Sequence, residues 1–544
     1  MQKQVSNAEL TAAATIPDKQ LSGGHGGQGS RDSSFVRLLE KNVDYDPLVL
    51  SDPDAIVGII AAALDQGLDD ATDTPDDQEN PFVPAAYTYL GQFIDHDLTF
   101  DTRSTLKPIP TGLSSFPDDE RTPRLDMDCL YGLGPNSAPF MYDEDGRLAT
   151  NPDKPFDLPR AAILFKPDDQ GSHRAIIGDP RNDENSIVCQ LQLAFLQFHN
   201  AMIAHFKQQG ASGTDLFIAA QREVRFTYQK IVVTDFLKRI VRSSVYDPFV
   251  ESHRTNGDAA YKLYKNGDLR EALPLEFTGA AYRFGHSEIR NAYRLNDHFQ
   301  KKVFDGSDNA TDSLVGFGDL PESHKIDWSL LVTDKLPPGE KGDNPSKVAG
   351  KDVPPDPRRL QYAYKIDTTL VNPLRALPPR IAGDKPPFNA LAARNIKRGY
   401  NFSLPSGQDL AKALGVTKHP PLVFGDQLLA FDKMPGMPAA DAAALQAHTP
   451  LWLYVLAEGQ ACLAEADGTF ATTTDEEGKT VIDKDSNDGT QLGPVGGRIL
   501  LETFFGILDS DDQSYFHAKA WQPIVKPGAD TITLWDVLRF VGLV

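Results

Sequence analysis

A short apolar segment near residue 95 carries the side chains whose types and spacing are best suited to chemistry. Residues 89–100 read YLGQFIDHDLTF, with Asp95, His96 and Asp97 in the middle of an amphipathic pattern. At about 100° per residue, a helix places Gln92 and His96 on one face, with Asp95 beside Gln92. A base, an amide and a carboxylate therefore face one site, whereas Asp97, about 200° from Asp95, faces another. The alternative is a buried histidine hydrogen-bonded to its neighbouring carboxylates.

The elements that must position these residues are predicted to be helices. Apolar residues recur every three or four positions over residues 87–98 after Pro84, 187–198, 215–241 and 494–508. Residues 215–241 contain neither glycine nor proline, which indicates one long helix. Alternating patterns are few and short, such as residues 161–165. We therefore predict a mainly α fold with little β-structure.

The composition excludes several classes of partner. The chain has 544 residues, with 54 Lys and Arg against 76 Asp and Glu, and its formal net charge of −22 disfavours nucleic acid and anionic membranes. The sequence contains no run of about 18 apolar residues, so we expect no membrane-spanning helix. The 3 cysteines are too few for a disulfide framework, and the chain opens without the apolar core of a secretory signal. We expect a protein that is cytoplasmic or exported without a cleaved leader.

Four short motifs follow one another along the chain. Residues 91–97 read GQFIDHD, residues 178–184 read GDPRNDE, residues 282–286 read YRFGH, and Asn395 lies in the string RNIKR. In this order they resemble the distal-histidine, distal-arginine, proximal-histidine and proximal-asparagine motifs of the animal-type haem peroxidases. This is the family of myeloperoxidase and lactoperoxidase within the peroxidase–cyclooxygenase superfamily. The resemblance spans most of the chain and implies a haem b cofactor.

On the distal side, the resemblance implies three catalytic residues. His96 would take a proton from the peroxide and return it to the departing oxygen as a general acid–base. Arg181 would stabilise the negative charge that develops as the O–O bond breaks, and a surface salt bridge is the alternative for this residue. Gln92, one turn from His96, would bind a distal water or a halide.

On the proximal side, the resemblance implies that His286 binds the haem iron. Asn395 would accept a hydrogen bond from the other ring nitrogen of His286 and so fix its tautomer. Arg283 would pair with a haem propionate.

Two carboxylates match those that esterify haem methyl groups in mammalian members of the family. They are Asp95 and Glu184, and the alternative for both is ordinary hydrogen bonding. Asn185 stands where one mammalian member has a methionine bonded to the haem, so a sulfonium link is excluded here.

Residues 122–128, TPRLDMD, resemble the calcium loop of the family. In an extended segment alternate residues point the same way, so Thr122, Asp126 and Asp128 can converge. Together with Asp97 and the carbonyls of Thr122 and Arg124, they would provide the hard oxygen ligands that Ca²⁺ prefers. A solvated acidic loop is the alternative.

The activity implied by the resemblance is the reduction of H₂O₂ and the oxidation of halide, thiocyanate or small phenolic donors through an oxo-ferryl intermediate. A haem fatty-acid dioxygenase of the cyclooxygenase-like branch is the alternative enzyme. Those enzymes place a radical-forming tyrosine three residues before the proximal histidine, where this chain has Arg283. The non-enzymatic alternative is an inert calcium-binding homologue with an adhesion or structural role. The joint presence of both histidines, Arg181 and Asn395 argues against it.

These motifs also bear on the organisation of the chain. Residues 1–34 end in a glycine- and serine-rich stretch and are predicted to be a flexible arm. Because His96 and Asn395 must meet at one haem, residues 35–544 are predicted to form one catalytic domain. The proline-rich stretch 334–359 is then a surface connector within that domain.

Overall fold

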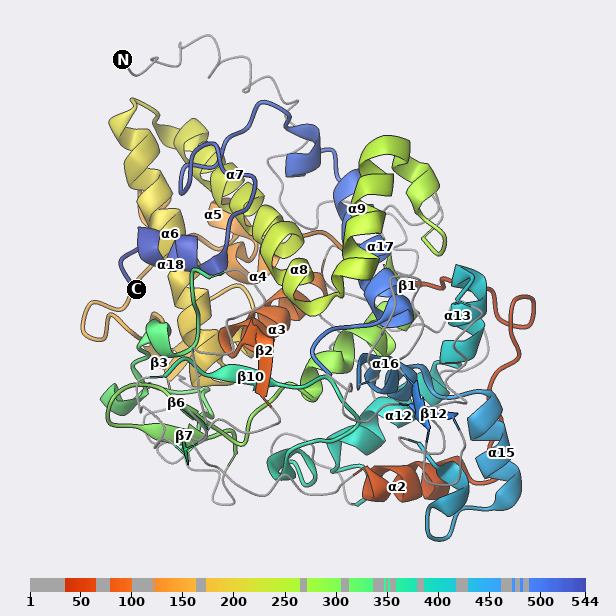
Figure 1. Ribbon diagram of the computed structural model, residues 1–544. Helices are drawn as coiled ribbons and strands as arrows, with labels where there is room; N and C mark the ends of the chain where they lie inside the picture. The colour runs from red at the N-terminus through yellow and green to blue at the C-terminus, as the bar shows by residue number, and fades with distance from the viewer. Residues whose placement is uncertain are drawn as a thin grey trace.

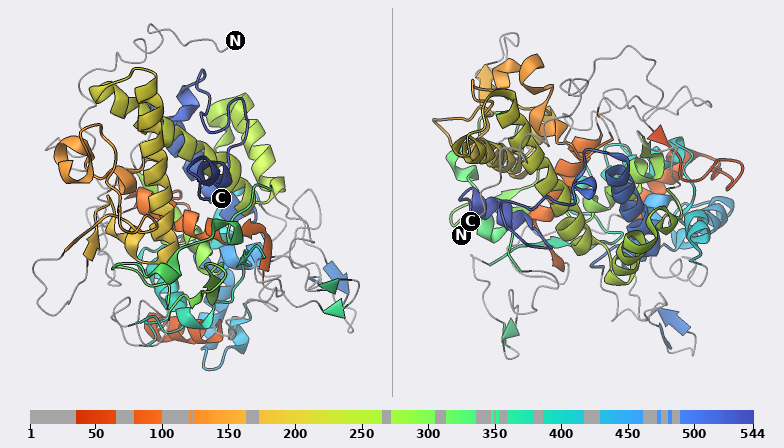
Figure 2. Two further views of the ribbon diagram at one scale, coloured as in Figure 1. Left: turned by 90° about the vertical axis from the view of Figure 1, so that its left-hand side faces the viewer. Right: turned by 90° about the horizontal axis from the view of Figure 1, so that it is seen from above.

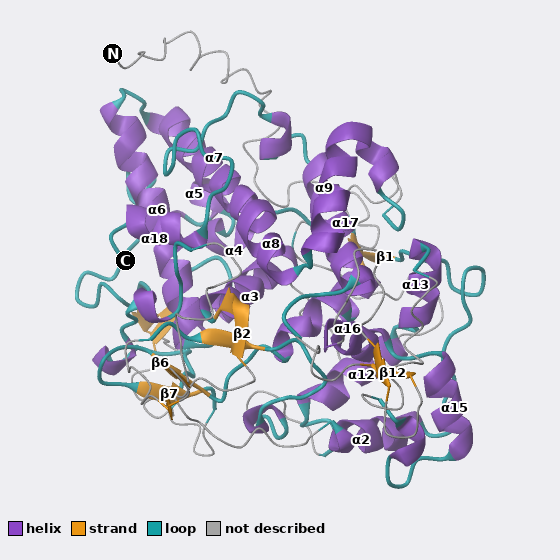
Figure 3. Ribbon diagram, viewed as in Figure 1, coloured by secondary structure: helices purple, strands orange, loops and turns teal. Residues whose placement is uncertain are grey.

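The computed structural model is largely helical, which confirms the expected mainly α fold (Figures 1 and 3). It describes residues 35–64, 79–99, 121, 123–162, 173–264, 272–304, 313–335, 347–348, 351–352, 359–378, 386–416, 429–460, 472–474, 480–482 and 489–544. The predicted arm 1–34 and most of the predicted connector 334–359 lie outside these residues. The division into an arm and one domain stays a prediction.

Helix α3 (Ala86–Leu98) lies in the middle of the molecule (Figure 1). It follows strand β2 (Glu79–Pro84), and its apolar residues are almost fully buried. Phe93 stacks on Phe195 with ring centroids 5.1 Å apart and meets the edge of Tyr228 at 6.0 Å. These contacts fix the rotation of α3 and therefore the direction of its polar residues.

Helices α6 (Ser186–Gln208) and α7 (Gly213–Ile231) lie side by side along one flank of the molecule (Figures 1 and 2). The Asn185 side chain accepts hydrogen bonds from the first backbone amides of α6, which is why α6 begins there. Helix α7 continues through the π-helical segment η5 (Val232–Phe236) into α8 (Leu237–Ile240). The long helix predicted over residues 215–241 is therefore present, with a π-helical interruption.

A second group of helices lies on the other side of α3 (Figure 1). It includes α9 (Ser243–Asn256), α10 (Leu275–Gly279), the 3₁₀ segment η7 (Ala281–His286), α12 (Leu391–Asn401), α13 (Gly407–Leu414), α15 (Ala439–Ala447), α16 (Leu451–Gln460) and α17 (Pro494–Ser510). Shorter or peripheral helices are α2 (Pro53–Ala63), α4 (Asp128–Tyr131), α5 (Gly134–Ser137) and α18 (Leu534–Phe540).

The strands of the described residues form only two-stranded ladders, which are small and scattered (Figure 3). The parallel pair is β1 (Phe35–Val36) with β5 (Leu273–Pro274). The antiparallel pairs are β10 (Tyr362–Tyr364) with β2, β3 (Arg160–Ala162) with β4 (His173–Ala175), β6 (Ala292–Arg294) with β7 (Gln300–Lys302), β8 (Lys347–Val348) with β9 (Lys351–Asp352), and β11 (Thr472–Thr474) with β12 (Thr480–Ile482).

One hydrophobic core runs through the described part of the chain, from Phe35 to Leu538. Helix α6 is so apolar that its length and composition alone would allow it to cross a membrane. However, 78% of its apolar window is buried inside the protein. A buried core helix meets the same criterion, so this helix is weak evidence for a membrane span.

Candidate active site

The histidines of the distal and proximal motifs line one cavity. Its volume is about 900 Å³, within the size range of cofactor sites. Its wall includes α3, η7 and the segment 183–185 that leads into α6. Of the residues predicted to catalyse or to bind haem, those that line it are Gln92, Asp95, His96, Glu184, Arg283 and His286. The helical spacing in α3 accounts for the three residues that come from it.

His96 is held from behind by an amide. Its Nδ1 lies 2.6 Å from the Oδ1 of Asn182, which does not line the cavity. An amide oxygen can only accept, so Nδ1 carries the proton and the lone pair of Nε2 faces the cavity. Burial lowers the pKa of His96 to about 4, and the positive charge of Arg181 adds to this effect. His96 is therefore a neutral base at physiological pH.

Arg181 is close to His96 but does not line the cavity. Its guanidinium pairs with Asp179 at 2.8 Å and donates to the backbone carbonyls of His96 and Thr99 at the end of α3. Although burial raises the pKa of Asp179, its hydrogen bonds and ion pair with Arg181 lower it to about 2. Arg181 is absent from the cavity lining, so its predicted role at the breaking O–O bond stays a prediction.

Gln92 connects α3 to the start of α6. Its Nε2 donates to a carboxylate oxygen of Glu184, and its Oε1 accepts from Asn185 Nδ2 at 3.1 Å. Burial raises the pKa of Glu184 to about 7. Gln92 and Glu184 are therefore brought together, and Glu184 and Asp95 both line the cavity. The ester links predicted for these two carboxylates stay a prediction.

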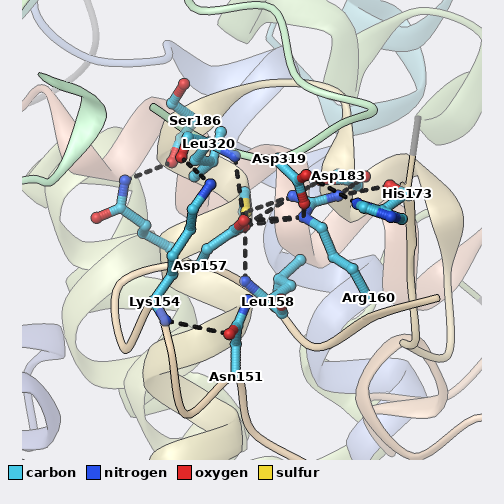
Figure 4. A network of polar contacts seen from close by, with 12 residues as sticks. Asn151, Lys154, Asp157, Leu158, Arg160, His173, Asp183, Ser186, Asp319 and Leu320 are labelled. Atoms are coloured by element: carbon cyan, nitrogen blue, oxygen red, sulfur yellow. Dashed lines mark hydrogen bonds and ion pairs between the residues drawn. The ribbon is translucent and has the colours of Figure 1, made fainter. Parts of the chain in front are cut away.

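A buried ion cluster behind the cavity holds the segment that carries Arg181 and Glu184 (Figure 4). Arg160 makes a 2.7 Å ion pair with Asp157 and a 2.8 Å ion pair with Asp183. The Asp183 carbonyl accepts from Phe317 N–H at 2.6 Å. A Cβ on Gly316 would lie 2.0 Å from that carbonyl oxygen, so only glycine allows this close approach. The distal segment is thus fixed by ionic and backbone contacts.

His286 ends η7 and lies against Asn395 of α12. The Nδ2 of Asn395 is 2.8 Å from His286 Nδ1, and in this orientation the amide donates to the ring. A half-turn of the amide would place Oδ1 there, which would accept from Nδ1–H and free Nε2 to bind a metal. Burial, followed by the charges of Arg283 and Arg398, lowers the pKa of His286 to about 3. The ring is neutral, as a metal-binding imidazole must be.

Arg283 and Tyr282 join η7 to its surroundings. Arg283 lines the cavity, its Nε donates to the Thr278 carbonyl at 2.9 Å, and its own carbonyl accepts from Trp452 Nε1 at 3.1 Å. Tyr282 also lines the cavity, and its hydroxyl donates to the Gly91 carbonyl of α3 at 3.1 Å. The distal and proximal segments are therefore linked by a direct hydrogen bond.

The calcium region is only partly described, because Thr122 lies outside the described residues. Asp97 is fully buried and accepts from the backbone N–H of Met127 at 3.2 Å. Its pKa is raised by burial and by the nearby charge of Asp128. Asp126 accepts from Asp128 N–H at 3.3 Å, and Arg124 lies 3.9 Å from Asp511. Among the described residues, no group of three or more His, Cys, Asp or Glu side chains is arranged to hold a metal ion.

The sequence reasoning missed several residues at the cavity. Glu288 is buried in its lining, its Oε1 has no hydrogen-bond partner among the described residues, and burial raises its pKa to about 8. Arg174 and Phe317 line the cavity and are exposed to solvent. Asn182 lies inside the quoted GDPRNDE string but was given no role. The sequence did offer one sign of buried polar contacts in this region, namely the two glutamines, Gln190 and Gln192, in the otherwise apolar start of α6.

Part of the chain is similar to one family of known proteins. Residues 114–315 match the family model for the animal haem peroxidases. Chorion peroxidase from Drosophila melanogaster is 25% identical over 248 residues, which cover 44% of this chain and 26% of that protein. A peroxidase-like protein from Margaritifera margaritifera is 23% identical over 352 residues, covering 49% of this chain and 41% of that protein. The chain therefore spans less than half the length of these curated relatives.

Solved structures extend the likeness over most of the chain. Peroxidase A from Dictyostelium discoideum matches with a TM-score of 0.53 at 16% identity, covering 94% of this chain and 93% of that chain. This likeness shows a common fold. A fatty acid α-dioxygenase from Arabidopsis thaliana matches with a TM-score of 0.47 at 17% identity, covering 86% of this chain and 71% of that chain. The family resemblance predicted from the sequence is confirmed.

Proposed function

We propose that this chain, which carries an animal haem peroxidase segment over residues 114–315, is a haem-dependent peroxidase. The observation that supports this most is the pairing of two neutral histidines, a buried His96 and a half-buried His286, on one cavity of about 900 Å³. His96 is held by an amide through Nδ1, and His286 lies against the amide of Asn395. A proton-transferring base and a metal ligand need these two environments.

The residues present fit a haem. His286 would bind the iron, Asn395 would orient His286, and Arg283 would pair with a propionate at the cavity wall. When bound, the haem supplies the iron that reacts with H₂O₂ and then withdraws electrons from the donor. Ester links through Asp95 and Glu184 are part of the proposal, since both carboxylates line the cavity.

The chemistry of the chain itself is the movement of one proton. Nε2 of His96 accepts the proton of the incoming peroxide and then donates it to the departing oxygen. Gln92, fixed by Glu184 and Asn185, offers its amide to a water or a small anion beside His96. Arg181 contributes its positive charge near His96. We propose halide, thiocyanate or a small phenol as the electron donor.

We also propose a calcium ion beside α3, although its fit is only partial. The carboxylates of Asp97 and Asp128 are close enough for the charge of Asp128 to raise the pKa of Asp97, and a cation between them would offset that repulsion. The remaining ligands would be Asp126, Thr122 and the carbonyl oxygens of Thr122 and Arg124. Chelation of calcium from the purified protein is expected to change the haem absorption spectrum through α3. A spectrum indifferent to chelators, with no calcium found by elemental analysis, would remove this part of the proposal.

The test of the proposed function is a haem titration followed by turnover. Addition of haem is expected to give a Soret band at one haem per chain, and H₂O₂ is expected to be consumed with bromide, iodide, thiocyanate or a phenol. Absence of a Soret band at saturating haem would favour the inert homologue.

A fatty-acid dioxygenase is the second candidate, and one observation supports it. Tyr282 is a buried phenol in the cavity wall and could carry a radical near the proximal histidine. Its hydroxyl is already hydrogen-bonded to the Gly91 carbonyl, and Arg283 occupies the position that the dioxygenases give to tyrosine. Oxygen uptake with linoleate and no added donor would support the dioxygenase.

A further inference from the structure

A chain of three hydrogen bonds runs from His96 away from the cavity and ends on the backbone. His96 Nδ1 lies 2.6 Å from Asn182 Oδ1, and Asn182 Nδ2 donates to Gln192 Oε1 at 2.8 Å. Gln192 Nε2 donates in turn to the carbonyl of Cys129 at 3.3 Å. The four groups come from α3, the distal-arginine segment, α6 and α4.

The direction of this chain is set at its far end. The Cys129 carbonyl can only accept, so Gln192 must turn its Nε2 toward it and its Oε1 toward Asn182. Asn182 must then donate through Nδ2, which leaves its Oδ1 facing His96. The reverse orientation of either amide would place two acceptors or two donors face to face. His96 is therefore required to carry its proton on Nδ1.

Burial makes this requirement strict. Asn182 and Gln192 are fully buried, so water is excluded as a replacement partner for either amide. An unmade hydrogen bond in such a place costs the full desolvation of the group. The Cys129 carbonyl is also closely packed, because a Cβ on Gly178 would lie 2.7 Å from its oxygen. Gly178 opens the same GDPRNDE string that contains Asn182.

We propose that Asn182 and Gln192 are positioning residues that transmit the polarity of the Cys129 carbonyl to His96 and so fix its Nδ1–H tautomer. This inference rests on the proposed peroxidase function, in which Nε2 of His96 must meet the peroxide as a base. Gln192 contributes only through Asn182 and does not touch the cavity.

Helix α6 provides a matched control. Gln190, two residues before Gln192, is also buried, but its amide bonds to the His324 carbonyl at 2.7 Å and to Ile326 N–H at 3.0 Å. Gln190→Leu and Gln192→Leu make the same chemical change, since each removes one buried side-chain amide from α6. Only Gln192→Leu breaks the chain to His96.

The first test measures the rate at which the ferric haem protein reacts with H₂O₂, followed by the Soret change in a stopped-flow instrument. Gln192→Leu is expected to slow this reaction about 10- to 100-fold, the scale seen when an outer orienting partner is removed. Gln190→Leu is expected to leave it unchanged. In an Asn182→Leu background, Gln192→Leu is expected to have no further effect, because both act through one path. Equal losses in both glutamine variants, or additive losses in the double variant, would overturn the proposal.

The second test reads the tautomer directly by ¹⁵N NMR of the histidine-labelled, full-length protein in its diamagnetic ferrous–CO form, with His96 assigned from the His96→Gln spectrum. Wild type and Asn182→Asp, which keeps an acceptor, are expected to show a proton on Nδ1, and Asn182→Leu is expected to lose that preference. A proton on Nε2 in wild type would overturn the proposal. A wild-type protein that binds no haem would instead contradict the proposed function.

Discussion

The distal and proximal histidines share one cavity and one charge state, but they are held in different ways. Burial lowers the pKa of His96 to about 4 and that of His286 to about 3, so both rings are neutral. His96 is tied through two buried amides to a backbone carbonyl. His286 has one amide neighbour, Asn395, whose side chain makes no second hydrogen bond among the described residues.

The difference corresponds to the two tasks. A proton-transferring base must present the same nitrogen before and after each proton transfer, so the protein must fix its tautomer. A metal ligand is oriented by its bond to the metal, and the protein then needs to supply only one suitable partner. The protein alone therefore orients His96, whereas His286 would be oriented jointly by the Asn395 amide and by the metal that it binds.

The largest effect is expected from removal of the proximal ring. His286→Ala deletes the proposed iron ligand, and the protein is expected to lose its Soret band after gel filtration. His199→Ala is the control, since His199 is also buried but hydrogen-bonds to Tyr131 and the Gly146 carbonyl away from the cavity. Full haem retention by His286→Ala would show that the proximal assignment is wrong.

Removal of the distal ring should separate haem binding from reactivity. His96→Leu keeps His286 and is expected to retain its haem, while its reaction with H₂O₂ slows about 10²- to 10⁴-fold, the usual contribution of a general acid–base. The two quantities are measured on one sample by absorbance and stopped-flow. Loss of haem with an unchanged peroxide rate per remaining haem would reverse the roles of the two sides.

A smaller effect is expected from the proximal amide. Asn395→Leu removes the only partner of His286 Nδ1 among the described residues, and haem affinity is expected to fall about 10- to 100-fold. The measurement is the rate of haem transfer to excess apomyoglobin. Asn182→Leu, which removes the corresponding amide on the distal side, is expected to transfer haem at the wild-type rate. Similarly faster haem transfer in both variants would show that the two amides contribute equally to haem retention.

The last effect concerns stability and uses a buried histidine outside the cavity. Burial lowers the pKa of His199 to about 4, against about 6.5 in an unfolded chain, so between these values the unfolded state binds the extra proton. Stability is therefore lost as pH falls from about 6.5 to about 4, by roughly 3 kcal/mol for this residue. In His199→Phe, the free energy of unfolding measured in urea is expected to depend less steeply on pH than in wild type. An unchanged slope in His199→Phe would contradict the assignment.

The sequence predicted the long helices because their apolar residues repeat over many turns. Helix α6 extends to Gln208, ten residues beyond the predicted segment, since Met202 and Ile203 continue its buried face. The short strands were beyond prediction. Strand β10 pairs with β2 across more than 270 residues, and nothing local in residues 362–364 specifies that partner.

Within the site, the motifs identified single residues better than the contacts between them. His96, His286 and Asn395 were found because each lies in a recognisable string. The bond between His96 and Asn182 joins positions 86 residues apart, so no local spacing reveals it. The ion pair between Arg181 and Asp179 was missed for a different reason, because two charged residues separated by Pro180 meet only in the folded turn.

The hydrogen bond from Tyr282 to the Gly91 carbonyl also ties the distal wall of the cavity to the proximal wall among buried and half-buried residues. The exposed part of the lining consists of Arg174, Pro180 and Phe317. Among the described lining residues, a cation and an aromatic ring therefore stand where the cavity meets solvent, and an anionic or aromatic donor would meet them before it reaches His96.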